Sequence, residues 1–295
     1  MSLSDCIPWI TVDLAESVAI VTLNLCTIIV FIKNRNLRKR STYLVINLAV
    51  IDMLAGGSAV YDFYRVGADC NVWKSHSIDG WVRYILYVLL LLFPISSLSN
   101  ITIIALERMH ATFWPLRHRV LKKSAYGIII AVVWVTAGLT TITHILLGHF
   151  GKLSDVYFYL RISLAVMCLL IIFVSYVFIV IKVRCGAQPR HHGPASRERK
   201  LTMTLLIVTV VSLLLYLPFN ILYFLIFITK SEILLSLSPS ESFCLFSAIF
   251  ALFYANHLVN PILYAIRMPE YRSALLALFR KRPQWQRRAV DLCDM

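Results

Sequence analysis

The sequence predicts an all-α membrane protein, a bundle of seven transmembrane helices followed by a short amphipathic helix. Of its 295 residues, 59% are hydrophobic and only 15% are charged, whereas a soluble globular domain carries about 25% charged residues. The apolar residues form seven long runs, and most Lys and Arg residues lie in alternate connections between them. These observations indicate a single membrane domain over residues 1–295.

Each of the seven apolar runs is long enough to cross a bilayer as one helix. About 20 helical residues span a hydrocarbon core that is about 30 Å thick. Lipid offers the backbone no hydrogen-bond partner, so helices are favoured, and the runs are too long and alternate too weakly for barrel strands. The runs lie at residues 14–32, 42–64, 82–106, 124–147, 157–181, 201–229 and 242–266.

The distribution of basic residues predicts the orientation of the bundle. Of the 29 Lys and Arg residues, 23 lie in the segments that follow the first, third, fifth and seventh runs. Connections rich in Lys and Arg stay in the cytoplasm. We therefore expect an extracellular N-terminus at 1–13, the helix bundle at 14–266, and a cytoplasmic helix and tail at 267–295. The net charge of +14 belongs to these connections and does not indicate a nucleic-acid-binding face.

The segment after the seventh run predicts the short amphipathic helix. Tyr271, Leu275, Leu278 and Phe279 recur at helical spacing, and basic residues lie on the other face. Such a helix lies on the inner surface of the membrane. The alternative is a frayed polar tail.

Several polar residues lie within the apolar runs, where polar groups are costly. Asp52 is the only acid deep in the second run, and an ionised carboxylate there needs a cation or a polar cluster. Asn24 and Asn47 are equally explained by hydrogen bonds between helices, each contributing about 0.6 kcal/mol. Asn256 and Asn260 lie in the seventh run.

Two prolines interrupt the last two runs. Pro218 lies in YLPF and Pro261 in NPILY. Each removes a backbone hydrogen bond and favours a kink, so either helix is a candidate lever.

Six motifs, one for each of the second to seventh spans, resemble in order those of rhodopsin-like (class A) G-protein-coupled receptors. NLAVID places Asn47 and Asp52 in the second run, and ERM at 107–109 stands where the family has Asp/Glu-Arg-Tyr. The resemblance covers nearly the whole chain. Its other matches are Trp134 in the fourth run, Tyr176 in the fifth, YLPF at 216–219 in place of Cys-Trp-x-Pro, and NPILY at 260–264 for Asn-Pro-x-x-Tyr.

This resemblance implies an activation switch. In the family, the Arg of the third-span motif pairs at rest with its neighbouring acid and often with an acid low in the sixth span. Arg108 would therefore pair with Glu107 and with Glu198, which lies at the matching position, 20 residues before Pro218. The alternative is that Glu107 and Arg108 are interfacial anchors. The other expected switch residues are Tyr176, Tyr216, Pro218, Asn260, Pro261 and Tyr264.

The resemblance also implies how the switch meets its partner. On activation, the sixth helix would move outward about Pro218 and open a cleft for a heterotrimeric G protein. Arg108, Tyr176 and Tyr264 would line that cleft. WPLRHR, at 114–119, would be the inner loop that meets the G protein.

A sodium site is a further implication of the resemblance. Asp52, Ser97, Asn256 and Asn260 match the positions that form this site in the family. An oxygen-rich cluster around one carboxylate suits a hard monovalent cation, which would act as an allosteric modulator and favour the resting state. We expect no other metal and no organic cofactor.

The chain departs from the family at its outer disulfide. Arg83 stands where the family has a cysteine at the top of the third span, and the second outer loop contains no cysteine. The outer cysteines Cys6, Cys70 and Cys244 allow three pairs. We expect a bridge from Cys6 to Cys244, which would tie the N-terminus to the last outer loop.

Positions that match the family's outer pocket bear on the ligand. Leu90 stands where amine receptors have an Asp, and Tyr254 where opsins have the retinal-binding Lys, so neither ligand is expected. Asp62 and Arg65 lie one turn apart and either contact a ligand or pair with each other. The pocket aromatics are also explained by packing, and the ligand is open between a lipid, a small molecule and a peptide. Tyr87, Asn220 and Tyr223 complete the candidate pocket.

An enzyme is not expected, because the sequence shows no nucleophile–base or metal-ligand set. The alternative to a receptor is a multi-span transporter or channel, whose polar path is not evident. We expect a plasma-membrane receptor with three partners: an extracellular ligand, membrane lipids and a heterotrimeric G protein.

Overall fold

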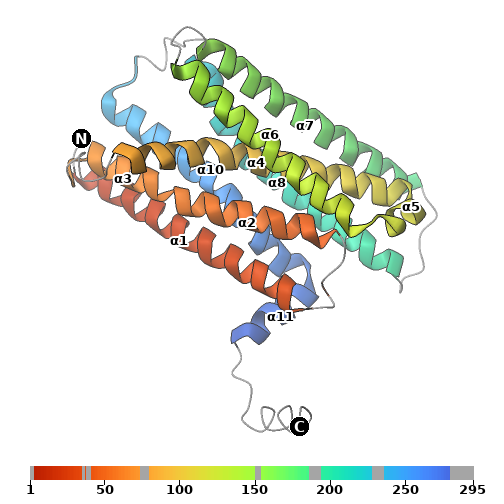
Figure 1. Cartoon of the computed structure of the whole chain (residues 1–295). Coiled ribbons are helices and arrows are strands. Elements are labelled where there is room, and N and C mark those ends of the chain that lie inside the picture. The colour runs from red at the N-terminus through yellow and green to blue at the C-terminus, as the bar shows by residue number, and fades with distance from the viewer. Residues whose placement is uncertain are drawn as a thin grey trace.

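The computed structural model describes residues 3–34, 37, 41–73, 80–149, 154–185, 194–227 and 236–279, and the regular elements within these ranges are all helices (Figure 1). Seven helical segments of this part of the chain are long and apolar enough to cross a membrane. The predicted fold class is therefore confirmed.

The helices follow the predicted runs, and the second span is divided into two consecutive helices. A helix in lipid satisfies its backbone hydrogen bonds internally, so the length of each apolar run was sufficient to predict where the helix lies. Their bounds are α1 Leu3–Lys33, α2 Thr42–Ser58, α3 Val60–Asp69, α4 Gly80–Phe113, α5 Pro115–Val120, α6 Lys123–His149, α7 Ser154–Cys185, α8 Pro194–Phe227, α10 Pro239–Arg267 and α11 Pro269–Phe279.

Two helical segments lie where the sequence did not predict helix. First, α1 begins at Leu3, so most of the segment 1–13, expected as a separate N-terminal segment, continues the first helix. Second, the expected loop WPLRHR contains the helix α5, which begins at Pro115. Proline suits the first position of a helix because its missing N–H would have no intrahelical partner there.

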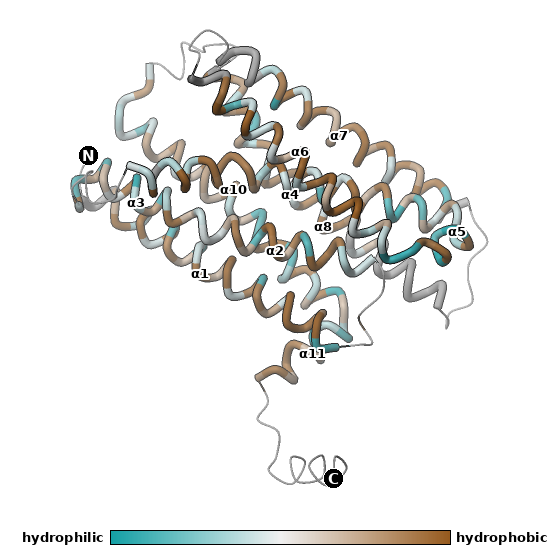
Figure 2. Tube along the Cα trace, in the orientation of Figure 1, coloured by the Kyte–Doolittle hydropathy of each residue, from teal (hydrophilic) through white to brown (hydrophobic). Residues whose placement is uncertain are grey.

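The helix α4 lies at the centre of the bundle and packs against α2, α6, α7 and α8. The helix α10 packs against α1, α2, α8 and α11, so it closes the other side of the bundle (Figure 1). Figure 2 shows apolar residues along every long helix and a hydrophilic stretch at α5. The buried interior, in contrast, holds charged side chains, including Asp52 and Arg108, both 0% exposed. These charges lie among many buried apolar side chains, and charged groups inside a membrane bundle are candidates for a functional role.

The amphipathic helix after the seventh span is confirmed as α11. Tyr271 is buried, Leu275 and Leu278 are half-buried, and Phe279 is exposed. The Tyr271 hydroxyl lies 2.8 Å from the Thr27 hydroxyl of α1 and shares a hydrogen bond with it, and burial raises the pKa of the phenol. The helix α11 is thereby fixed against the end of α1 (Figure 1).

Candidate functional site

The pair Glu107–Arg108 lies at one end of the bundle, and both side chains are buried. The Nε of Arg108 donates a hydrogen bond to Oε2 of Glu107 over 2.5 Å, and a second guanidinium nitrogen forms an ion pair with the same oxygen. A buried charge is costly unless it is paired. An anchor at the membrane edge would reach water, so the burial of Arg108 favours a switch over an anchor.

Two further side chains hold Glu107, and sequence reasoning missed both. The Nε2 of His118, on α5, lies 2.6 Å from Oε1 of Glu107. The Tyr126 hydroxyl, near the start of α6, donates to the same oxygen over 3.2 Å and also lies 3.2 Å from His118 Nε2. Glu107 therefore joins α4, α5 and α6. The only sequence signal was a His and a Tyr shortly after ERM, which carries no information about distance in space.

The other expected switch residues lie on the predicted helices. The Tyr176 hydroxyl, on α7, lies 2.8 Å from the Thr209 hydroxyl on α8. Tyr264 is buried and its ring contacts Phe31 and Tyr271 at centroid distances of 6.2 and 6.0 Å. The side chain of Glu198 lies outside the described residues, so its pairing with Arg108 stays a prediction. Pro218 lies within α8, and Pro261 within α10.

Tyr216, also expected in the switch, lies in the bundle interior. Its ring contacts Phe253 and Phe219 at centroid distances of 5.6 and 6.2 Å. Tyr216, Phe219 and Phe253 form an aromatic cluster between α8 and α10. A movement of α8 would require these rings to repack.

A second polar cluster surrounds the buried carboxylate of Asp52. Asn260 donates from Nδ2 to Oδ2 of Asp52 over 2.6 Å, and Ser97 donates from Oγ to Oδ1 over 3.4 Å. His257 Nδ1 lies 2.7 Å from Oδ1, where the carboxylate accepts the hydrogen bond. The carboxylate is thus satisfied by α4 and α10. His257 was missed, although a His inside an apolar run is itself an unusual feature.

The residues around Asp52 fit a sodium ion in their donor chemistry. Within the described part of the chain, the amide oxygens of Asn256 and Asn260 are buried and have no hydrogen-bond partner. Ser97, Asn256 and His257 line one narrow cavity between α4, α8 and α10. These oxygens, with the carboxylate, suit a hard cation, while His257 competes for one carboxylate oxygen.

Asn24 and Asn47 form hydrogen bonds between helices, which is one of the roles that the sequence suggested for them. Asn24 donates from Nδ2 to the backbone oxygen of His257 over 3.0 Å. Asn47 donates to Oδ1 of Asn100 over 2.8 Å and accepts from Trp134 Nε1 over 3.1 Å. They connect α1 to α10, and α2 to α4 and α6.

The candidate ligand pocket divides into separate groups of contacts at the opposite end of the bundle. Asp62 is buried, accepts a hydrogen bond of 2.5 Å from the Tyr254 hydroxyl, and accepts one of 3.2 Å from Arg65 Nε. The pairing of Asp62 with Arg65, one of the two alternatives that the sequence left open, therefore occurs. Arg65 also pairs with Asp69 at 3.3 Å and lies over the ring of Phe250.

A second group of pocket residues surrounds Arg161, a buried cation on α7 that was not among the predicted pocket residues. Its guanidinium carbon lies 4.3 Å from the centroid of the Tyr223 ring. Arg161 and Asn220 line one narrow cavity together with Tyr216. A charged residue inside the fifth apolar run was the available signal.

The remaining two pocket residues lie on α4. The Tyr87 hydroxyl lies 2.8 Å from His144 Nε2 on α6. Leu90 packs against the hydrophobic core. The structure thus brings Asp62 together with Arg65 and Tyr254, while the other candidates form contacts of their own.

The predicted disulfide between Cys6 and Cys244 is wrong in its second cysteine. Cys6 is bonded to Cys70, with Cα atoms 6.0 Å apart, and Cys244 is a free cysteine. The reason is the helical N-terminus: α1 runs past its predicted start and carries Cys6 to the end of α3, where Cys70 follows Asp69. Cys244 packs against a small hydrophobic cluster that contains Cys6, Val66 and Phe243, but it forms no disulfide.

A membrane bundle of seven long helices, with a buried Glu-Arg pair at one end and a carboxylate cluster in its interior, defines the class of seven-transmembrane receptors. Residues 23–155 and 149–264 match the family model described as 7 transmembrane receptor (rhodopsin family), and the chain belongs to this family. It is a multi-pass membrane receptor of the G-protein-coupled class and not an enzyme.

Curated relatives are similar over most of the chain. The Substance-K receptor of Mus musculus is 25% identical over 310 aligned positions, which cover 92% of this chain and 75% of the relative. The Substance-K receptor of Homo sapiens is 26% identical, with 92% and 72% covered. Melanocortin receptor 5 of Rattus norvegicus is 23% identical over 290 positions, with 89% and 82% covered. These similarities do not favour the alternative of a transporter or channel.

Proposed function

We propose that this receptor binds an extracellular ligand and activates a heterotrimeric G protein by outward movement of α8. The observation that carries the proposal is the buried Arg108, held by Glu107 at one end of the bundle. Membership of the family supports G-protein signalling as the function. The Glu107–Arg108 pair is a contact of the proposed resting state that activation would break.

The proposed orientation places the Arg108 end in the cytoplasm and the N-terminus outside the cell. It rests on the excess of Lys and Arg in the connections at the Arg108 end. Both side chains of the ion pair are buried, so separating them without new partners is costly, and the pair biases a two-state bundle towards the resting state. Movement of α8 would separate the Tyr176–Thr209 contact and expose Arg108, Tyr176 and Tyr264 to the G protein.

The proposed ligand site is the end of the bundle that contains Asp62. The Asp62–Arg65–Tyr254 cluster and the buried Arg161 supply charged groups of both signs. The relatives carry the names Substance-K receptor and Melanocortin receptor 5, so a peptide is the ligand class that we propose. A ligand screen that identifies a lipid or a small molecule instead would contradict the proposal of a peptide ligand.

We further propose sodium as an allosteric modulator. Asp52, Ser97, Asn256 and Asn260 would hold the ion, which supplies a positive charge beside the carboxylate. The resemblance to the receptor family implies that the ion binds the resting state more tightly. A ligand that prefers one state shifts the equilibrium towards it, so sodium would favour the resting state.

The test of the receptor function is a G-protein dissociation assay in cells that express the chain, with peptide, lipid and small-molecule libraries added outside. A hit should activate the wild type and lose its effect with Arg108→Ala at equal surface expression. Lys33→Ala, an exposed basic residue at the same end, is the matched control and should keep the response. Substrate uptake or ionic current that persists in cells without G proteins would contradict the proposal.

A further inference from the structure

Two acidic residues of α1, Asp13 and Glu16, lie one turn apart near the Cys6 end of the first membrane-spanning segment, Cys6–Lys33. Asp13 is 5% exposed and, in the part of the chain that the structure describes, forms no hydrogen bond and no ion pair. The Oε2 of Glu16 is buried and has no hydrogen-bond partner there either. An ionised carboxylate in such a place is costly. Each of the two carboxyl groups therefore needs a positive charge or a proton.

The groups that face Asp13 carry more negative charge than positive charge. On α3, Asp62 and Arg65 both interact electrostatically with Asp13, and on α10 the Tyr254 hydroxyl does so as well. Glu16 is the neighbouring acid on α1 itself. Among these described groups, Arg65 is the one cation.

The single charge of Arg65 is already shared by two other carboxylates. Its Nε donates to Asp62 over 3.2 Å, and its Nη1 lies 3.3 Å from Asp69. A metal ion does not complete the balance, because the described residues include no group of three His, Cys, Asp or Glu side chains that could hold one. A proton needs neither a cavity nor a set of ligands, so it is the cation that fits Asp13 and Glu16.

We propose that Asp13 and Glu16 bind protons from the extracellular side, so that the receptor senses extracellular acid. A proton from a hydronium ion would add to a carboxylate oxygen and leave a water molecule behind. The proposal rests on the orientation proposed above, which places the Asp62 end of the bundle outside the cell. Protons would enter along the cluster, because the side chains of Arg65 and Asp69 are 33% and 50% exposed.

Protonation changes the contacts that Asp13 can make. A neutral carboxyl group is a hydrogen-bond donor, so a protonated Asp13 would donate to Asp62 and join α1 to α3. An ionised Asp13 would repel Asp62 and compete with it for Arg65. Asp62 also accepts the 2.5 Å hydrogen bond from Tyr254, so loss of the proton would loosen α1, α3 and α10 together. Acid therefore stabilises the arrangement of helices seen in this structure.

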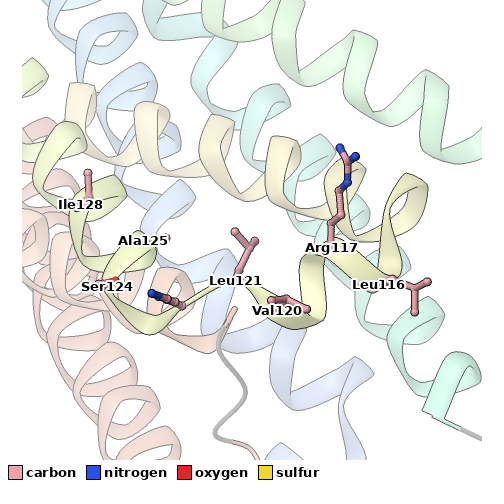
Figure 3. A pocket seen from close by; sticks show the side chains of 8 residues that line it. Leu116, Arg117, Val120, Leu121, Ser124, Ala125 and Ile128 are labelled. Atoms are coloured by element: carbon pink, nitrogen blue, oxygen red, sulfur yellow. The ribbon is translucent and has the colours of Figure 1, made fainter.

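The opposite end of the bundle has charge of the other sign. A groove of about 630 Å³ between α5 and the start of α6 is lined by the basic residues Arg117 and Lys122 and by no acidic residue of the described chain (Figure 3). Glu107, the buried acid of that end, is paired with Arg108. The unpaired buried carboxyl groups thus lie at the Asp62 end, so acid should act from outside the cell.

The experiment measures the melting temperature of the purified full chain in detergent, from about pH 5 to about pH 8. The folded receptor would hold protons that the unfolded chain releases, so its stability should fall as the pH rises. For each carboxyl group that loses its proton in this range, the unfolding equilibrium constant should rise by up to about tenfold per pH unit. The double variant Asp13→Asn/Glu16→Gln should lose this part of the pH dependence, because amides do not titrate.

The matched control removes an exposed carboxylate from the same end of the bundle. Glu241→Gln, at the start of α10, keeps the capping box with Ser238, because Gln also fits the third position of that motif. It should melt with the pH dependence of the wild type. Histidines titrate in the same range but are present in every variant, so the difference between the curves isolates Asp13 and Glu16.

A second measurement tests the sensing of acid in cells. Basal G-protein dissociation should rise as the extracellular pH rises from about 6 to about 8, because acid stabilises the resting arrangement. The double variant, at equal surface expression, should not respond to extracellular pH. Basal signalling that is present in the wild type but does not respond to pH would overturn the sensing of acid.

Two melting results would overturn the proton site itself. One is a wild-type pH dependence that the double variant retains. The other is an equal loss of pH dependence in Glu241→Gln, which means a diffuse surface effect. If the double variant does not fold, the single variants Asp13→Asn and Glu16→Gln take its place, and each should remove about half of the difference. A complete absence of G-protein signalling would contradict the proposed function and not the melting result, so the two proposals fail separately.

Discussion

The imidazole Nε2 of His118 and the Oε1 of Glu107 lie 2.6 Å apart, so the short helix α5 is bonded to the acidic partner of Arg108. The hydroxyl of Tyr126 contacts both groups. Because α5 lies in the segment proposed to meet the G protein, we expect contact with that protein to be coupled to the state of the Glu107–Arg108 pair.

Replacing His118 should raise ligand-independent signalling. The substitution His118→Ala removes one hydrogen bond from Glu107 and loosens α5. One hydrogen bond contributes about 1 kcal/mol, which corresponds to about a fivefold shift between resting and active populations. The measurement is constitutive G-protein dissociation at equal surface expression.

The control for His118 is a substitution on the same helix that touches no polar partner of Glu107. Val120→Ala, at an exposed position, should signal like the wild type. Tyr126→Phe removes only a hydroxyl and should give a smaller increase than His118→Ala. Equal basal signalling in all four proteins would exclude α5 as a support of the resting state.

Glu198 carries the second predicted contact of Arg108. The substitution Glu198→Ala should raise basal signalling, because α8 would lose its expected ion pair with α4. Glu198→Asp keeps the charge and should remain closer to the wild type. If Glu198→Ala leaves basal activity unchanged at matched surface expression, the ion pair does not restrain α8.

The seven spans could be predicted from the sequence because the bilayer imposes one simple requirement on each. A helix must be apolar over a fixed length, and that property is local to each run. The resemblance to the receptor family grouped Ser97 and Asn260 with Asp52, and the structure brings these side chains together, while their role as a sodium site stays a prediction. Local pattern and family motif were sufficient for these features.

The features that could not be predicted depend on where separate helices meet. His118 reaches Glu107 because the chain leaves the helix at Trp114 and begins the separate helix α5 at Pro115, and His257 reaches Asp52 across 205 positions of chain. The disulfide partner depended on the unforeseen length of α1, which carries Cys6 to Cys70. Composition and periodicity contain no distances between helices, so these contacts required the structure.

Loss of the disulfide should destabilise the end of the bundle that contains Asp62. Cys6 and Cys70 are 64 positions apart, and a crosslink of this span contributes about 4 kcal/mol in the chain-entropy account. Cys6→Ser and Cys70→Ser should lower the melting temperature of the purified receptor by similar amounts. Their combination should lower it no further.

Cys244→Ser discriminates between the two possible partners of Cys6. It removes a free thiol and should leave the melting temperature close to that of the wild type. A loss of stability with Cys244→Ser that equals the loss with Cys6→Ser, together with a stable Cys70→Ser, would mean that Cys6 pairs with Cys244 instead.

His257 and the proposed sodium ion would compete for the carboxylate of Asp52. If the oxygens around Asp52 hold sodium, the wild type should melt at a higher temperature in sodium chloride than in choline chloride of equal ionic strength, because binding to the folded state stabilises it. Asp52→Asn removes the charge and should abolish this difference. His257→Ala frees Oδ1 of Asp52 and should enlarge it. Melting curves that do not respond to sodium in either the wild type or His257→Ala would exclude the site, and the imidazole would then be the lasting partner of the carboxylate.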